Sequence, residues 1–515
     1  MKKRVSAVVQ MAHHHSHPQH FKPRIHYDFM KSLAAVMAVV MLMSGTLAGM
    51  QTEQGGHPHT GTPSENEASC TETYDLLIIT PSQFRDSLEP FQWHKEQHGV
   101  KTLVVTLDEI YGGTYFSVNG RDDAEKVKYF IKNAYDEWHI TYVLLVGGRR
   151  PVMQETWWCP VRYSHCGVSS DWESKFLSDL YFADIYDEEG HFSSWDADGD
   201  GIFGEWTANG AEDSLIDLYP DVYVGRWPAR FVSEVKVMVA KTIAYENNAH
   251  GQSWFNKMVC VAGDTYPDDL NPEWVGYEGE EGTQQAMNWM PGFEYVKLWT
   301  SEGTLTGPQD VINAISDGCG FLFFDGHGSP MSWATHPPSD HNTWIDGLKM
   351  YHMPMLNNKD MYPVCVVGGC HNSQFNISMF NWLKIYEGYA KWYEYVYKGE
   401  TWFGCWSWLL ARQSDGGSIA TLGYSALGYT KEDKWELGGE GGASEWLDTH
   451  FFWEYGMNGT QVLGDIWGNT INGYLNTYPI DWNSPVESPS GIDAKTAQEW
   501  ILIGDPSLMI GGYPG

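Results

Sequence analysis

The sequence predicts an α/β protein whose parallel sheets carry helices on both faces, arranged as two consecutive subdomains. Short runs of consecutive apolar residues alternate along the chain with longer runs whose apolar residues recur at helical spacing. Uninterrupted apolar strands are typical of parallel sheets that are buried on both faces. The alternation occurs in residues 73–250 and again in residues 251–515, so each range is expected to form one subdomain.

The first subdomain is expected to start with the strand "YDLLIITP". The helix "SQFRDSLEPFQWHKEQHG", the strand "VKTLVVTLDEI", the helix "DAEKVKYFIKNAYDEW" and the strand "YVLLVGG" follow in that order. An irregular stretch from Arg149 to Pro220 interrupts the pattern, which resumes with the strand "DVYVGRWPA" and the helix "SEVKVMVAKTIAYENNA". Alternating strands and helices predict a parallel sheet.

The second subdomain repeats the alternation. Its expected elements are the strand "KMVCVAG", the helix "EGTQQAMNWM", the strand "FEYVKLW", the helix "GPQDVINAISDG", and the strands "GFLFFDGHG" and "PVCVVGGC". The last two strands end in reactive residues, and the carboxyl ends of parallel strands meet at the same edge of a sheet.

The N-terminus has the features of an export signal. Between Met30 and Met50 a lysine precedes an apolar run and then small residues, the order of a secretory signal peptide. We therefore interpret residues 1–49 as an extension and signal peptide, with Met30 a possible true start, and residues 50–72 as a flexible spacer. A retained membrane anchor is the alternative. The protein is expected to be secreted or at the cell surface, with no stable membrane span after signal cleavage.

The net charge bears on the possible partners, and the positions of the cysteines bear on disulfides and burial. The formal net charge of -34 disfavours nucleic acid, because an acidic surface repels phosphates. The spacing of Cys159 and Cys166 predicts a disulfide in an exported protein. Cys260, Cys319 and Cys365 lie in apolar runs and are expected to be buried and inert.

His327 and Cys370 are the candidate catalytic residues. Each follows a buried strand and has glycine beside it, which lets a substrate approach the backbone closely. An imidazole can activate a cysteine nucleophile, and the amides of Gly328 and Cys370 can hold a substrate oxyanion. Cys365 competes as nucleophile, but it lies inside its strand. Asp325, which lies two residues before His327, is interpreted as a turn residue.

The segment "WDADGDGIFGEW" is a candidate calcium loop. Asp196, Asp198, Asp200 and Glu205 supply hard oxygen ligands, which Ca²⁺ prefers. The loop is not an EF-hand, since Thr207 occupies the twelfth position. Further possible ligands downstream are Asp217 and Asp221. A solvated acidic loop is the alternative.

Four motifs stand out along the chain: "GRWPA", "GHGSPMSW", "VVGGCHNSQF" and "WILIGDPSLMI". With these motifs, the chain from about Tyr74 to Ile510 resembles the gingipain-type family of the caspase-like cysteine peptidases. The resemblance implies a caspase-like fold, with Cys370 as nucleophile, His327 as general base and Gly328 as oxyanion donor. It also implies structural calcium near residue 200, and no organic cofactor is expected.

Other roles follow from the same resemblance. Asp264 stands where a family acid can orient the histidine, and a solvated loop carboxylate is the alternative. Glu278, Glu280 and Glu281 lie where family members select Arg or Lys before the scissile bond. The long loop after His327 also carries three further histidines that shape the cleft, bind a metal or are merely solvated: His336, His341 and His352.

The sequence thus predicts an exported, calcium-stabilised cysteine endopeptidase that acts on proteins or peptides. Two alternatives use the same fold. One rival is a non-catalytic calcium-binding surface protein whose Trp-rich loops bind polymers. The other is a transpeptidase that passes the acyl group to an amine instead of water.

Overall fold

The computed structural model describes residues 73–213, 216–272, 276–430 and 442–514. These residues belong to one compact unit, which runs from Thr71 to Gly515. The interpretation of residues 1–72 as signal peptide and spacer lies outside the described residues, so export stays a prediction. In the described ranges, no helix has both the length and the apolar character needed to cross a bilayer.

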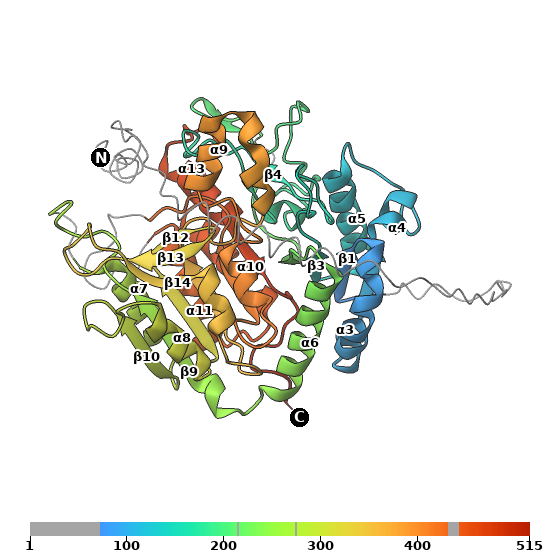
Figure 1. The fold of residues 1–515 in the computed structure, drawn as a ribbon. Coiled ribbons are helices and arrows are strands. Elements are labelled where there is room, and N and C mark those ends of the chain that lie inside the picture. The colour runs from blue at the N-terminus through green and yellow to red at the C-terminus, as the bar shows by residue number, and fades with distance from the viewer. Residues whose placement is uncertain (1–72, 214–215, 273–275, 431–441, 515) are drawn as a thin grey trace. The chain divides into compact units, whose positions relative to one another are not determined.

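A four-stranded parallel sheet in the order β2-β1-β3-β8 forms the N-terminal part of this unit. Its strands are β1 (Leu76–Thr80), β2 (Thr102–Thr106), β3 (Tyr142–Val146) and β8 (Tyr223–Trp227). Its helices are α3 (Arg85–Gln97), α4 (Leu107–Gly112), α5 (Asp123–Trp138) and α6 (Val232–Asn248). The connections from β1 to β2 and from β2 to β3 run in opposite directions, so right-handed crossovers place α3 and α5 on opposite faces (Figure 1).

A six-stranded sheet in the order β10-β9-β11-β15-β16-β17 follows, parallel except for β17. Its strands are β9 (Lys257–Ala262), β10 (Glu294–Trp299), β11 (Phe321–Asp325), β15 (Val364–Gly368), β16 (Ala420–Tyr424) and β17 (Trp500–Ile503). Its helices are α7 (Glu278–Asn288), α8 (Pro308–Ser316), α10 (Trp406–Ala411), α11 (Ser444–Gly456), α12 (Leu463–Thr477) and α13 (Pro489–Glu499).

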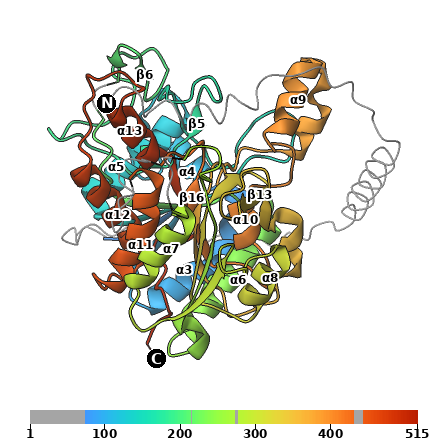
Figure 2. The same ribbon diagram turned by 90° about the vertical axis from the view of Figure 1, so that its left-hand side faces the viewer.

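Helices cover both faces of this second sheet, as the sequence predicts. Successive side chains of a strand point to opposite faces, and β11 shows this clearly. The ring of Phe323 packs on Phe452 of α11, whereas the ring of Phe324 packs on Trp406 of α10, both with centroids 5.1 Å apart. In Figure 2, α7 and α11 lie on one side of the sheet and α8 and α10 on the other.

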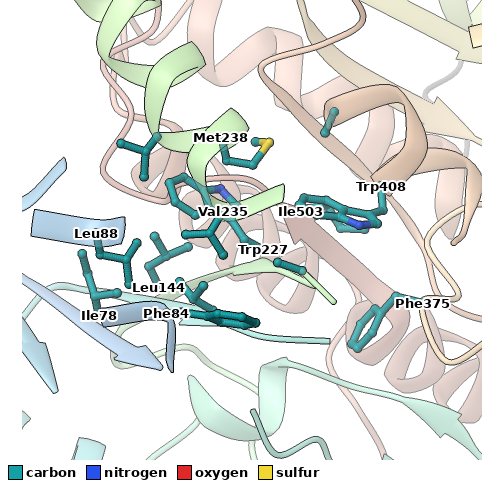
Figure 3. Packing of buried hydrophobic residues seen from close by; sticks show 14 of the residues in the cluster. Ile78, Phe84, Leu88, Leu144, Trp227, Val235, Met238, Phe375, Trp408 and Ile503 are labelled. Atoms are coloured by element: carbon teal, nitrogen blue, oxygen red, sulfur yellow. The ribbon is translucent and has the colours of Figure 1, made fainter. Parts of the chain in front are cut away.

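The two sheets share a hydrophobic core where β8 and β17 meet. Gly504, which follows β17, donates its amide to the carbonyl of Arg226 in β8 at 3.2 Å. Figure 3 shows Ile503 and Trp408 from the second sheet region beside residues of the first, and these side chains are fully or almost fully buried. The ranges predicted as two subdomains therefore pack against each other through apolar side chains, each of which contributes roughly 1.5–3 kcal/mol when buried.

A small antiparallel sheet stands beside the ends of β11 and β15. It consists of β12 (His327–Ser329), β13 (Ser332–Thr335) and β14 (Ile345–Lys349). The remaining short elements are β4 (Tyr163–Ser164), β5 (Phe176–Leu177), β6 (Trp206–Thr207), β7 (Gly210–Ala211), η1 (Ser82–Phe84), η2 (Leu180–Phe182), η3 (Ser253–Asn256), η4 (Met350–Met355), η5 (Met379–Glu387) and α9 (Tyr389–Tyr397).

Two local predictions are wrong. The predicted strand "VKTLVVTLDEI" ends at Thr106, because Thr106 and Glu109 form a capping box that starts α4. Cys159 and Cys166 form no disulfide: both are free and buried, and the Cys166 thiol instead faces the carbonyl of Gly491 at 3.7 Å. By contrast, the predicted burial of Cys260, Cys319 and Cys365 is confirmed, since each side chain has no exposed surface.

Candidate active site

The register between β11 and β15 brings His327 and Cys370 to the same edge of the sheet. Asp325 pairs with Gly368 across the two parallel strands, and each candidate residue lies two positions further along. The Gly326 amide continues the ladder by donating to the Gly368 carbonyl at 2.9 Å. A Cβ atom placed on Gly328 would lie only 2.6 Å from the Cys370 carbonyl oxygen, so the two loops touch.

The segment after Cys370 turns sharply and is held from two sides. His371 has a left-handed φ of 61°, a conformation that costs a non-glycine residue free energy and is common at functional sites. Its amide donates to the Ala426 carbonyl at 2.8 Å. The buried side-chain amide of Asn372 donates to the carbonyls of Ser329 and Ser332, at 2.8 and 3.0 Å. Asn372 therefore ties the cysteine loop to the loop that follows His327.

A backbone carbonyl orients His327. Its Nε2 lies 2.8 Å from the Thr265 carbonyl oxygen, which can only accept, so Nε2 carries the proton and Nδ1 is left as the basic nitrogen. The rings of Tyr266, His336 and Trp344 surround the imidazole, with centroids 5.3–5.8 Å away. Burial, followed by the nearby His336, lowers the pKa of His327 to about 4.

Cys370 is partly exposed, and its thiol faces the Gly428 carbonyl at 3.8 Å. Burial raises the pKa of this thiol to about 11, so at neutral pH both members of the pair are uncharged. Cys365 differs from Cys370, because it lies inside β15 with no exposed surface and burial raises its pKa well above the usual value. Among the cysteines that the structure describes, Cys370 alone combines partial exposure with a histidine at the end of the neighbouring strand.

The predicted acids lie around this pair in different ways. The buried carboxylate of Asp264 accepts from the Ser339 amide at 2.9 Å, and it is the next residue, Thr265, that contacts His327. The interpretation of Asp325 as a turn residue is wrong: it is the last residue of β11 and is 7% exposed. It points inward because the side chains of a strand alternate and Phe324 takes the other face.

The three candidate specificity residues occupy the first turn of α7. Glu278 is buried and accepts from the amide of Tyr266, which flanks His327, at 3.1 Å; burial raises its pKa to about 8. Glu280 is engaged by the Ser301 amide at 2.9 Å, and Glu281 is exposed. Of these three acids, Glu278 is thus the one whose hydrogen-bond partner flanks His327.

The acidic loop brings together only part of the predicted calcium ligand set. Asp196 and Asp198 lie with Asp213, all three offering oxygen atoms within 4.8 Å of one another, while Asp200 and Glu205 are outside this group. Asp213 was absent from the sequence prediction. Carboxylate oxygens suit Ca²⁺, although Arg121 forms an ion pair with Asp196 at 2.5 Å. Asp217 and Asp221 accept from backbone amides elsewhere.

The other loop histidines have partners of their own. His336 contacts the Thr343 carbonyl at 2.8 Å, His341 contacts Asp269 at 2.8 Å, and the His352 ring accepts from the Lys349 amide at 3.2 Å. Among the described residues, the groups of side chains close enough to share a metal ion include none of these three. His336 alone shapes the surroundings of His327.

A cysteine and a histidine that end neighbouring parallel strands of an α/β sheet define the class of caspase-like cysteine peptidases. Within that class the chain belongs to peptidase family C25, whose model matches residues 70–511. This confirms the resemblance seen in the sequence motifs.

Known relatives are similar at low identity. Gingipain R2 of Porphyromonas gingivalis is 21% identical over 443 residues, which cover 84% of this chain and 46% of the relative. Lys-gingipain of the same organism is 21% identical over 372 residues, covering 70% of this chain and 16% of the relative. The chain therefore spans less than half the length of these relatives.

Solved structures agree in fold. A complex of the pro- and mature domains of Porphyromonas gingivalis RgpB has a TM-score of 0.56 at 18% identity, over 85% of this chain and 79% of that one. The Arg-specific cysteine proteinase gingipain R gives 0.56 at 17% identity, over 87% and 80%. These likenesses confirm the predicted caspase-like α/β fold.

Proposed function

We propose that the protein is a cysteine endopeptidase that uses Cys370 as nucleophile and His327 as general base. The observation that carries the proposal is the pairing of β11 with β15, which sets both residues at one sheet edge with the Gly328 backbone against Cys370. The substrates of this peptidase would be proteins or peptides, as the name of the family indicates.

Because Cys370 and His327 are both uncharged at neutral pH, the reaction begins with a proton transfer from the thiol to the imidazole. His327 Nδ1 takes the thiol proton as the Cys370 sulfur attacks the peptide carbonyl, and the Gly328 and Cys370 amides support the resulting oxyanion. The C–N bond then breaks, and His327 gives its proton to the leaving amine. Water, deprotonated by His327, hydrolyses the thioester. Because the pKa of His327 is about 4, the base form persists down to roughly that pH.

A preference for Arg or Lys before the scissile bond is part of the proposal. Glu278 is the favoured partner, because the amide that it accepts from belongs to Tyr266, which packs on His327. A cationic side chain placed beside Glu278 would lower the raised pKa of this carboxyl and favour its charged form.

The first test uses the full chain and acyloxymethyl ketones that carry Arg, Lys or norleucine. We expect the Arg and Lys reagents to form a thioether with the Cys370 sulfur, located by peptide mapping, and peptides to be cleaved after the same residues. Equal labelling by the norleucine reagent would contradict the preference for basic residues.

Absence of both labelling and cleavage, in protein whose folding is shown by circular dichroism, would reject the peptidase. It would favour the non-catalytic binding protein instead. Transfer of the peptide acyl group to an added amine in preference to water would favour the transpeptidase.

Calcium held by Asp196, Asp198 and Asp213 is also proposed. We expect added Ca²⁺ to raise the melting temperature by several degrees and chelation to lower it, because a ligand present at a hundred times its Kd stabilises the folded state by about 2.7 kcal/mol. Asp213→Asn should remove the response to Ca²⁺. Glu205→Gln serves as the matched control, since Glu205 lies outside the group of three carboxylates. A calcium response that survives Asp213→Asn and disappears in Glu205→Gln would restore the ligand set predicted from the sequence.

A further inference from the structure

A pocket of about 230 Å³ lies next to the segment that follows the candidate nucleophile. His371, the residue after Cys370, is part of its wall. On the other side, Glu173 lines the pocket and accepts from the Leu427 amide at 2.9 Å. Leu427 precedes Gly428, whose carbonyl faces the Cys370 thiol. The pocket wall thus includes the residue after Cys370 and an acid that is bonded to the segment facing the Cys370 thiol.

Arg149 is a buried cation in this pocket with unused donors. Its side chain lines the pocket and is only 2% exposed. Nη1 donates to the carbonyl of Asn376. In the described structure, Nε and Nη2 have no hydrogen-bond partner. Nε and Nη2 form one edge of the guanidinium, which is the edge that binds a carboxylate through two parallel hydrogen bonds.

Each acid of the pocket wall has a hydrogen-bond or ion-pair partner other than Arg149. Glu155 accepts from the Tyr163 hydroxyl at 2.5 Å, Glu173 pairs with Lys495 at 3.1 Å, and Glu400 accepts from Gln374 at 3.0 Å. Glu394 pairs with Lys398 at 2.9 Å. A buried guanidinium with an unpaired edge is costly, and an incoming carboxylate would satisfy it.

We propose that this pocket is a substrate subsite for a carboxylate, with Arg149 as the residue that binds it. The proposal rests on the peptidase function proposed above and adds a substrate class: peptides that carry either an acidic side chain or a free terminal carboxylate near the cleaved bond. Arg149 acts in specificity and takes no part in the transfer of protons.

The test compares matched fluorogenic peptides with the full chain. One series is amidated at the C-terminus and carries Glu or Gln at each position around the cleaved bond; a second series contains only Gln and ends in a carboxylate or an amide. We expect kcat/KM to be roughly tenfold or more higher for the acid than for the amide in one series, since a charge-assisted pair is worth more than about 1.4 kcal/mol. The series that responds identifies the source of the carboxylate.

Arg149→Gln should remove this ratio, and Arg150→Gln should keep it, because Arg150 is exposed and is not part of the pocket wall. Where Arg149→Gln does not fold, Arg149→Lys replaces it, and loss of most of the ratio supports the proposal. Equal rates for acid and amide at every position in the wild type, or a ratio unchanged in a folded Arg149 variant, would overturn it.

Failure of the peptidase itself is distinguishable from failure of this subsite. If the wild type cleaves no peptide, calorimetric binding of the same peptides to the full chain decides the question. Tighter binding of the acid, lost in Arg149→Gln, upholds the subsite without catalysis. Equal binding of acid and amide rejects it.

Discussion

Cys370→Ala is expected to lower kcat/KM for peptide cleavage by roughly a thousandfold or more, as removal of the nucleophile does in covalent catalysis. Within the described ranges, Cys370 is the cysteine that has both partial exposure and a histidine at the end of the neighbouring strand. His327→Ala should cause a loss of similar size, because the thiol pKa of about 11 leaves it protonated at neutral pH without a base. Initial rates with a peptide that the wild type cleaves after Arg or Lys measure both effects.

Cys365→Ala is the matched control for this pair of variants. Cys365 has no exposed surface and lies within β15, so the loss of its sulfur should cost some stability and leave the kcat/KM of folded protein near that of wild type. Thermal unfolding of all three variants separates the two effects. An active Cys370→Ala protein would remove Cys370 from the mechanism.

The sequence could predict most of the sheet framework, because its strands are short apolar runs with buried side chains on both faces. Thus the predicted strand "GFLFF" coincides with most of β11. The helices on the sheet were predictable from helical spacing, and "DAEKVKYFIKNAYDEW" coincides with α5. β16 was missed: its sequence "ATLGY" is short and contains glycine, and it becomes a strand only by pairing with β15. Periodicity carries no information about such pairing.

The candidate site was predictable where side chains carry the chemistry, as for Cys370 and His327. It was not predictable where backbone or distant residues act. Thr265 contacts His327 through its carbonyl, which every residue type has. Asp213 joins Asp196 from 17 positions away, and Arg149 reaches its pocket from the end of β3. Only the folded chain brings these residues to the sites that they serve.

Behind the two strand ends lies a buried cluster of carboxyl groups that no sequence pattern predicts: Asp325, Glu445 and Asp448. They are 7%, 5% and 1% exposed. Glycines make room for them: a Cβ on Gly282 would lie 2.3 Å from an Asp325 oxygen, and one on Gly368 would lie 2.9 Å from an Asp448 oxygen. Burial raises the pKa of Asp325 to about 7 and those of Glu445 and Asp448 well above their usual range.

Asp325→Asn is therefore expected to stabilise the protein at pH 8 relative to wild type. The carboxyl has a higher pKa when folded than when unfolded, so between about pH 4 and pH 7 the folded state binds a proton that the unfolded state has lost. Wild-type stability then falls as pH rises through this range, by up to about 1.4 kcal/mol per pH unit for one group. Asparagine has a similar shape and no proton to hold, so this loss disappears in the variant.

Urea unfolding at pH 5 and pH 8 measures the effect as the difference in free energy of unfolding between variant and wild type. That difference should move in favour of Asp325→Asn by a few kcal/mol between the two pH values. The control is Asp86→Asn, at an exposed position in α3. For this variant the difference in free energy of unfolding should be the same at both pH values. A constant difference for Asp325→Asn as well would mean that this carboxyl is ionised in the folded protein, and that the cluster behind the active site carries charge at neutral pH.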